Sequence, residues 1–245
     1  MNTEEPLFSE LKNQPAYKQI ADKLQRAVMD KHLKPGDLLP IETELAIQFG
    51  VNRSTIREGI RHLEQTGLVE RKGKRLIVSR PGVDQVGDQV SRVLVAHDVT
   101  FRELWETQMP LELLAARLAA GKTDPAMIAR LERNLEATAL LSCGDLAIVE
   151  LDLEFHALIA EASGNKALLM AREALARLFF PAFKIGMFPQ TAASRLLEAH
   201  THIVNAIKLG DEDRAVDWMH KHIVDFRRGY ELAGRDLDSP VPFQP

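Results

Sequence analysis

The chain has 245 residues, of which 45% are hydrophobic and 27% are charged, and its formal net charge is −4. A chain of this length and composition is expected to fold around two modest hydrophobic cores. Its single cysteine, Cys143, excludes an intramolecular disulfide, and no apolar run is long enough to span a membrane. The acidic amino terminus lacks the apolar core of a signal peptide, so we predict a cytoplasmic protein.

The net charge hides an uneven distribution of basic residues. Residues 1–80 carry 14 Lys and Arg against 11 Asp and Glu, whereas residues 81–245 carry 17 against 24. The excess is concentrated in residues 50–80, which hold 8 basic and 3 acidic residues. Because a locally basic surface attracts phosphates even on an acidic protein, the first part of the chain is the candidate for binding nucleic acid.

The first predicted elements are helical. Residues 1–14 are expected to form a flexible arm, and residues 16–32 have the apolar spacing of a supporting helix. A short helix follows and ends at Gly50. A second helix is predicted to begin at Asn52, whose side-chain oxygen can accept backbone N–H groups of the first turn. This second helix has an apolar stripe formed by Ile56, Ile60 and Leu63.

Another face of the second helix is basic. Arg53, Arg57 and Arg61 recur every fourth residue and therefore share one side of the helix. Arg53 and Arg57, near the start of the helix, are expected to contact DNA bases or phosphates. Arg61 lies further along the helix, and we expect it to be a solvated or salt-bridged residue.

A basic hairpin is predicted to follow this helix. Gly67 ends the helix, and strands at residues 68–70 and 76–79 flank a basic turn at residues 71–75. Helix, tight turn, basic helix and basic hairpin are typical of a winged helix-turn-helix that binds double-stranded DNA. We therefore expect residues 15–80 to be a DNA-binding domain. Its expected DNA contacts are Arg53, Ser54, Thr55, Arg57, Arg71, Lys72, Gly73 and Lys74.

After Gly82 the strand pattern stops and only helical spacing continues. Breaks at glycine and proline delimit seven predicted helices, which favour a helical bundle over residues 81–234. The expected fold class is mainly α, with a winged helix-turn-helix domain followed by an all-α domain. Residues 235–245 are expected to be a disordered tail. The predicted helices are residues 83–97, 101–121, 124–141, 145–162, 166–184, 191–209 and 211–232.

Four potential metal ligands are predicted to face the inside of this bundle. Asp152 and His156 lie four residues apart on an apolar helix face, and His200 and His222 lie in the apolar stripes of two later helices. One carboxylate and three imidazoles are a suitable ligand set for Zn²⁺, Ni²⁺ or Mn²⁺, with Zn²⁺ favoured. Each group could instead be a satisfied core or surface residue, because spacing along the chain does not show convergence.

The first domain also carries a series of short motifs in a fixed order. These are Pro35-Gly36, Leu39-Pro40, Leu45-Ala46, Phe49-Gly50-Val51, Arg53, Ile56-Arg57-Glu58, Leu63, Gly67-Leu68-Val69 and Gly73. The series resembles the amino-terminal domain of GntR-type bacterial transcription regulators. That resemblance implies a transcription regulator that binds an operator.

The second domain resembles the helical effector domain, or FCD domain, of the FadR-type branch of this family. The residues that carry the resemblance are Asp152 with His156, His200 with Ile203, Ser163-Gly164-Asn165, and Met219 with His222. The resemblance implies a divalent metal held by the aspartate and the three histidines, with a small organic or sugar acid as effector against the metal. Our leading hypothesis is therefore a homodimeric, ligand-responsive regulator of a palindromic operator, with repression favoured and activation as the alternative.

Two residues depart from the family pattern. Gln108 stands where the family usually has an arginine that can pair with an effector carboxylate, so this position offers hydrogen bonds without charge. Thr43 stands where the family usually has a DNA-contacting arginine, so the resemblance implies a DNA contact there. Threonine can contact a phosphate but cannot bind guanine bidentately.

Two other functions remain as alternatives. One is a metal-dependent hydrolase, suggested by His97-Asp98, although the further ligands of HD-type hydrolases have no counterpart earlier in this domain. The other is a constitutive DNA-binding dimer whose affinity ignores every small molecule. Turnover of a carboxylate would indicate the hydrolase, whereas an effector that changes stability would indicate the regulator.

Overall fold

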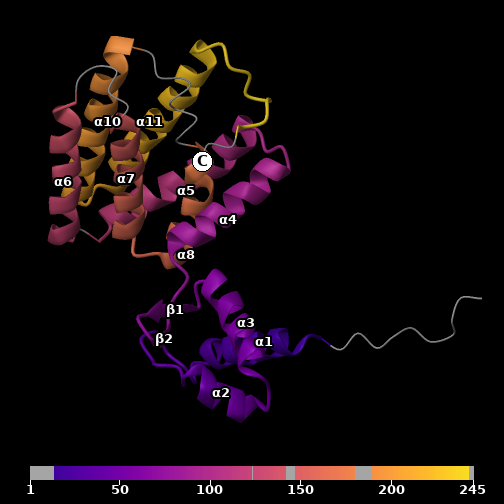
Figure 1. The fold of residues 1–245 in the computed structure, drawn as a ribbon. Coiled ribbons are helices and arrows are strands. Elements are labelled where there is room, and N and C mark those ends of the chain that lie inside the picture. Colours follow the sequence, from indigo (N-terminus) through magenta and orange to yellow (C-terminus); the bar gives the residue numbers. More distant parts are fainter. Residues whose placement is uncertain (1–13, 123, 142–146, 180–188, 243–245) are drawn as a thin grey trace, which may run out of the picture. The chain divides into compact units, whose positions relative to one another are not determined.

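The computed structural model describes residues 14–122, 124–141, 147–179 and 189–242 (Figure 1). The chain divides into two compact units between Gly82 and Val83. Both units are mainly helical, and no described helix combines the length and apolar character needed to cross a membrane. Nearly all of the arm predicted for residues 1–14 lies outside the described residues.

The described part of the first unit contains three helices and a two-stranded antiparallel sheet. They are α1 (Ala16–Met29), α2 (Glu42–Phe49), α3 (Arg53–Gln65), β1 (Val69–Lys72) and β2 (Arg75–Val78). The strands pair as far as Lys72 opposite Arg75, so only Gly73 and Lys74 form the turn. The predicted five-residue turn is therefore wrong in length, because its outer residues belong to the paired strands.

The core of this unit joins α1, α3 and the hairpin. Ile56, Ile60 and Leu63 of α3 are at most 1% exposed, as their spacing predicts. Gly59 on the same helix lets α1 approach closely, since a Cβ atom there would lie 3.0 Å from the carbonyl oxygen of Tyr17. The opposite face of α3, which carries the basic ridge, is left exposed.

A three-residue connection leads from α2 into α3. Gly50 ends α2 with φ 65°, a left-handed conformation that glycine adopts without a steric penalty. Asn52 precedes α3 as predicted, but its side chain makes no capping hydrogen bond. Its backbone carbonyl accepts from Thr55 N at 3.1 Å and from Ile56 N at 3.2 Å. The predicted side-chain cap is therefore wrong, because the backbone oxygen alone receives these N–H groups.

The second unit is a bundle of helices in which α5 packs against α7, α8, α10 and α11. The helices are α4 (Val83–Ala96), α5 (Phe101–Ala120), α6 (Pro125–Ala139), α7 (Ala147–Ala162), α8 (Lys166–Phe179), α10 (Pro189–Leu209) and α11 (Glu212–Leu232). Helices α10 and α11 run side by side, and α4 lies along α8 (Figure 1). The predicted ends differ from these by at most two residues wherever the chain is described, and positions 145–146 and 180–184 lie outside the described residues.

Two of the predicted helix starts are capped by carboxylates. Asp124 accepts from Ala126 N at 2.9 Å, and Asp211 accepts from Arg214 N at 3.0 Å. Pro125 occupies the first position of α6. An N–H at this position would have no partner within the helix, so the helix loses no hydrogen bond through proline. Local sequence therefore sets where α6 and α11 begin.

The chain after α11 differs from the predicted tail. Residues 235–242 are described, and within them Leu237 and Val241 are buried against the core. Val241 N donates to Val99 O at 2.9 Å, and Arg102 N donates to Leu237 O at 2.9 Å. Two apolar side chains thus hold this segment against the start of α5, because their burial outweighs the cost of ordering a short stretch.

Candidate metal centre and DNA-binding surface

Four buried side chains from three helices of the second unit meet around one point. Asp152 and His156 lie on α7, His200 lies on α10 and His222 lies on α11. One ligand atom from each falls within 4.8 Å of the others. Because the first two are one helical turn apart, α7 presents both on the same face. Helices α10 and α11 supply one imidazole each.

The three imidazole rings turn their Nε2 atoms towards one carboxylate oxygen. Oδ1 of Asp152 lies 3.2 Å from Nε2 of His200, 3.6 Å from Nε2 of His222 and 3.7 Å from Nε2 of His156. Nε2 of His222 lies 3.1 Å from Nε2 of His156 and 3.3 Å from Nε2 of His200. Oδ1 of Asp152 accepts no hydrogen bond from any residue that the structure describes.

This arrangement fits a divalent cation. Two imidazole nitrogens 3.1 Å apart can share only one proton, and a third nitrogen faces the same point. Metal–nitrogen bonds of about 2.0–2.1 Å place two ligand nitrogens about 2.8–3.4 Å apart at octahedral or tetrahedral angles. The observed spacing is that of donors around one shared ion, and the donor set suits Zn²⁺, Ni²⁺ or Mn²⁺.

A buried carboxylate on α5 orients one of the imidazoles. Oε2 of Glu112 lies 2.8 Å from Nδ1 of His156, and Oε1 accepts from Nε of Arg172 at 2.7 Å. Burial by itself would raise the pKa of Glu112, but the charges of Arg172 and His156 lower it to about 2. An ionised Glu112 can only accept hydrogen bonds, so Nδ1 of His156 carries a proton, and in the neutral ring the lone pair lies on Nε2.

Burial also keeps His200 in the form that binds metals. Its ring stacks on Phe155 with centroids 3.6 Å apart and planes 7° apart. Burial lowers the pKa of His200 to about 3, against the opposing effect of Asp152. Burial acts to raise the pKa of Asp152, but its contacts with His200 and His222 lower it overall. A neutral imidazole beside an ionised carboxylate is the protonation state that a metal ion requires.

Glu112 and Arg172 belong to this site but were not expected there from the sequence. Both are completely buried, and together with Gln108 they form a connected polar group beside His156. Two local signals were present. Gln108 and Glu112 are four apart and so share a helix face, and Arg172 interrupts the apolar stripe of α8. A charged residue within an apolar stripe indicates a buried partner.

Gln108, the predicted effector contact, is anchored from one end. Its Nε2 donates to Oε1 of Glu112 at 2.5 Å, whereas its Oε1 accepts no hydrogen bond from any described residue. Since an ionised Glu112 cannot donate, the amide must face it with nitrogen and present oxygen elsewhere. The residue therefore offers an acceptor inside the bundle.

Other histidines of this unit lie away from the cluster. His202 stacks on Trp218 with ring centroids 3.9 Å apart, and His220 is exposed. His97 and Asp98 are exposed just after α4, as expected for the end of a helix.

A basic groove of about 560 Å³ lies beside α3 and the hairpin in the first unit. Its basic lining comes from Arg53, Arg57 and Arg61 of α3 and from Arg71 and Lys74 of the hairpin. Thr43 and Gly73 also line it. Arg61, which was expected to be a solvated or salt-bridged residue, thus lines the same groove as the two arginines before it.

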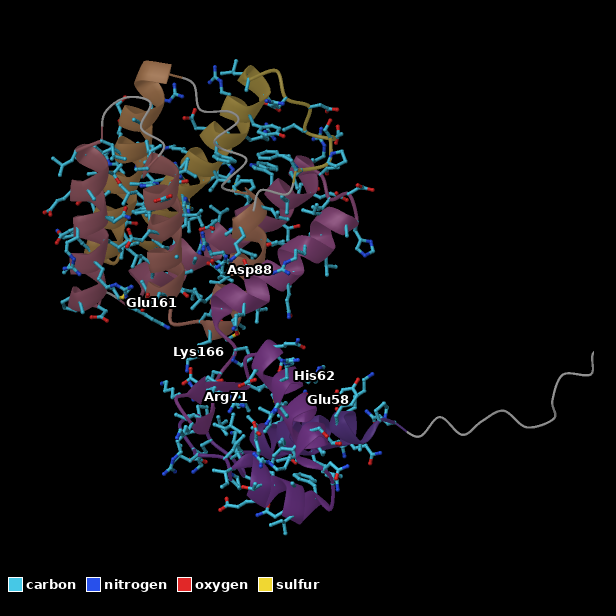
Figure 2. All side chains as sticks on the ribbon, viewed as in Figure 1. Glu58, His62, Arg71, Asp88, Glu161 and Lys166 are labelled. Carbon is cyan, nitrogen blue, oxygen red and sulfur yellow. The ribbon has the colours of Figure 1, made fainter. Side chains whose placement is uncertain are left out.

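Three further predicted contacts do not line the groove. Ser54 is exposed, Thr55 is half-buried, and Lys72 is exposed with Nζ 2.9 Å from Oε1 of Glu70. Figure 2 labels Arg71 on the hairpin side of this unit. Its guanidinium contacts Glu42 and Glu64, two groove residues that sequence reasoning did not single out.

Family models match both units. The model described as "Bacterial regulatory proteins, gntR family" matches residues 16–78, and the model described as "FCD domain" matches residues 103–225. The first covers the helices and hairpin that form the basic groove. The second spans Gln108, Glu112 and all four residues of the histidine and aspartate cluster.

Similar proteins match more than four fifths of the chain. LutR, an HTH-type transcriptional regulator of Bacillus subtilis, is 29% identical over 81% of this chain and 93% of its own length. A putative L-lactate dehydrogenase operon regulatory protein of Escherichia coli is 30% identical over 84% of this chain and 82% of its own length. The HTH-type transcriptional repressor NanR of Cronobacter sakazakii is 26% identical over 83% of this chain and 81% of its own length. Among solved structures, Streptococcus agalactiae GntR matches 86% of this chain and 99% of its own, with TM-score 0.62 and 28% identity.

Proposed function

The chain belongs to the GntR family of bacterial DNA-binding transcription regulators and carries an FCD domain, and we propose on this premise that it is a ligand-responsive repressor. In this proposal the second unit binds a divalent metal and a small carboxylate effector, and the protein acts as a cytoplasmic homodimer. The observation that carries the proposal is the convergence of Asp152, His156, His200 and His222 inside the bundle. The relatives are named as regulators and not as enzymes, so the hydrolase alternative is set aside.

The first unit would bind a palindromic operator through its basic groove. Arg53, Arg57 and Thr43 line the groove and would contact base edges or phosphates, with Ser54 and Thr55 at the start of α3. The hairpin residues Arg71, Lys72, Gly73 and Lys74 would contact the backbone or the minor groove. In a symmetric dimer the two copies of the first unit, one from each chain, would bind half-sites about 34–36 Å apart, which is one helical turn of DNA.

In the second unit, the aspartate and the three histidines would hold the metal, with Zn²⁺ favoured over Ni²⁺ and Mn²⁺. When bound, the ion supplies a Lewis-acidic centre that attracts a carboxylate. Glu112 keeps Nε2 of His156 available as a ligand by accepting the Nδ1 proton. Gln108 would hydrogen-bond the effector, since its Oε1 is an acceptor that no described residue satisfies.

A small organic acid is the favoured effector class. The name of the E. coli relative connects that protein with an L-lactate dehydrogenase operon, and lactate is a small hydroxy acid. The acid can change DNA binding only by the difference between its affinities for the binding and the non-binding states of the dimer. Repression would end when the acid favours the state that does not fit the operator.

A thermal-shift screen tests this function. Organic and sugar acids are added to the protein with and without a chelator. An acid at about 100 times its Kd should stabilise by about 2.7 kcal/mol, or about 5–10 °C in Tm, and the chelator should abolish the shift. If no acid shifts the Tm while operator binding is retained, the protein is a constitutive DNA-binding dimer instead.

A further inference from the structure

We propose that Glu42 is a specificity-determining residue of the DNA-binding surface. It holds Arg57 and Arg71 in a charge-neutralised arrangement and so weakens binding to DNA of unrelated sequence. The inference rests on the proposed DNA-binding role of the basic groove and identifies a residue that restricts it.

Glu42 joins basic residues from two other elements. Oε2 of Glu42, on α2, lies 3.2 Å from Nη2 of Arg57 on α3, and Oε1 lies 3.1 Å from Nη2 of Arg71 on β1. Nε of Arg71 also lies 3.3 Å from Oε1 of Glu64 on α3. The side chain of Glu42 is only 15% exposed, whereas that of Arg57 is 62% exposed. The carboxylate therefore lies beneath the two guanidinium groups that would meet the DNA.

The groove thus contains two kinds of basic residue. Arg57 and Arg71 are paired with carboxylates, whereas Arg53, Arg61 and Lys74 have no ion-pair partner among the residues that the structure describes. The unpaired residues present their full charge to any DNA phosphate. The paired residues present much less, because the carboxylates cancel most of their charge beyond the groove.

This difference separates general attraction from sequence recognition. Binding to DNA of any sequence is driven by counterion release, which scales with the number of phosphates neutralised. Arg57 and Arg71 can contact phosphates and so add to this general binding only if they leave Glu42. The unpaired carboxylate of Glu42 then lies close to the DNA and is repelled by the phosphates, which costs free energy. Only a site that offers both arginines well-placed acceptors compensates for that loss. Penalising the wrong partner in this way is a recognised route to specificity.

Charge-neutral substitutions test the proposal on the full chain. The probe is a random-sequence duplex, and its binding to wild type, Glu42→Gln and Glu58→Gln is measured by fluorescence anisotropy at several KCl concentrations. Glu58 lies on α3 in the same unit and does not line the groove (Figure 2). Its substitution changes the net charge by the same amount without releasing Arg57 or Arg71.

Glu42→Gln is expected to bind the random duplex several-fold more tightly than wild type at low salt. Its plot of log K against log salt should be steeper by about one, because at least one further phosphate is neutralised. Glu58→Gln should match wild type. Selection from a random duplex library should enrich a shared motif less strongly with Glu42→Gln than with the other two proteins.

Several results would overturn the proposal. Equal affinity, salt slope and motif enrichment for Glu42→Gln and wild type would show that Glu42 does not restrict binding. If Glu42→Gln does not fold, Glu64→Gln, which removes one of the two carboxylates on Arg71, should change affinity and slope in the same direction by less. No change in Glu64→Gln then rejects the idea. If wild type binds no duplex at low salt, the proposed DNA-binding function fails first, and this inference fails with it.

Discussion

Nδ1 of His156 lies 2.8 Å from Oε2 of Glu112, although the two residues are 44 positions apart in the chain. The same carboxylate accepts from Arg172, so one buried group links α5, α7 and α8. This contact determines which nitrogen of His156 carries its proton. It therefore connects the packing of the bundle to the chemistry of the candidate metal centre.

Glu112→Gln should weaken metal binding while leaving all four proposed ligands in place. A glutamine amide can donate to Nδ1 of His156, which moves the ring proton to Nε2 and removes the lone pair from the ligand position. Loss of such a supporting partner typically lowers metal affinity about 10- to 100-fold. Competition with a chromophoric chelator measures the change.

Glu106→Gln is the matched control for this prediction. Glu106 lies on the same helix and is exposed, so the charge change is equal but His156 keeps its partner. Metal affinity should equal that of wild type. An unchanged affinity in Glu112→Gln would mean that the hydrogen bond does not set the tautomer of His156.

The double variant His200→Ala with His222→Ala should lose most of its bound metal. Two of four ligands disappear, and the remaining pair on α7 leaves the ion incompletely coordinated. Elemental analysis of the purified protein measures metal per chain. His202→Ala with His220→Ala should retain wild-type content, because neither side chain belongs to the cluster. Unchanged content in the first variant would refute the proposed site.

Arg57→Ala should abolish measurable operator binding at physiological salt. A bidentate contact between arginine and guanine contributes about 1–3 kcal/mol, and the loss of a phosphate contact would add to this. Circular dichroism and metal content should remain unchanged, because Arg57 is exposed on the first unit. Arg26→Ala, at an exposed position of α1 that does not line the groove, is the control for removing one positive charge. Retained operator affinity in Arg57→Ala would contradict the placement of the DNA in this groove.

Val241→Ala should destabilise the protein even though it lies near the end of the chain. The side chain is 3% exposed and packs in the core of the second unit, so its truncation should cost about 1–2 kcal/mol. Urea denaturation measures the change in the free energy of unfolding. Val93→Ala, at a position that is 57% exposed, should change it by less than about 0.5 kcal/mol. Equal stability of the two variants would show that residues 235–242 contribute little to the free energy of unfolding.

Much of the fold follows from local patterns in the sequence. Apolar spacing places Ile56, Ile60 and Leu63 inside, and the carboxylates of Asp124 and Asp211 mark where two helices begin. These features depend on residues within one or two turns, so periodicity and capping chemistry are enough to predict them. The side-chain cap expected of Asn52 shows the limit, because a favourable residue type does not guarantee the hydrogen bond.

The sequence by itself determined the basic ridge of α3 and the inward direction of Asp152, His156, His200 and His222. A helix face depends only on spacing, which the chain specifies locally. Only the tertiary structure decided that these four side chains meet, that Glu112 and Arg172 support them, and that Glu42 holds two arginines of the groove. Such contacts join residues from different helices, and the packing that sets their distances involves the whole of each unit.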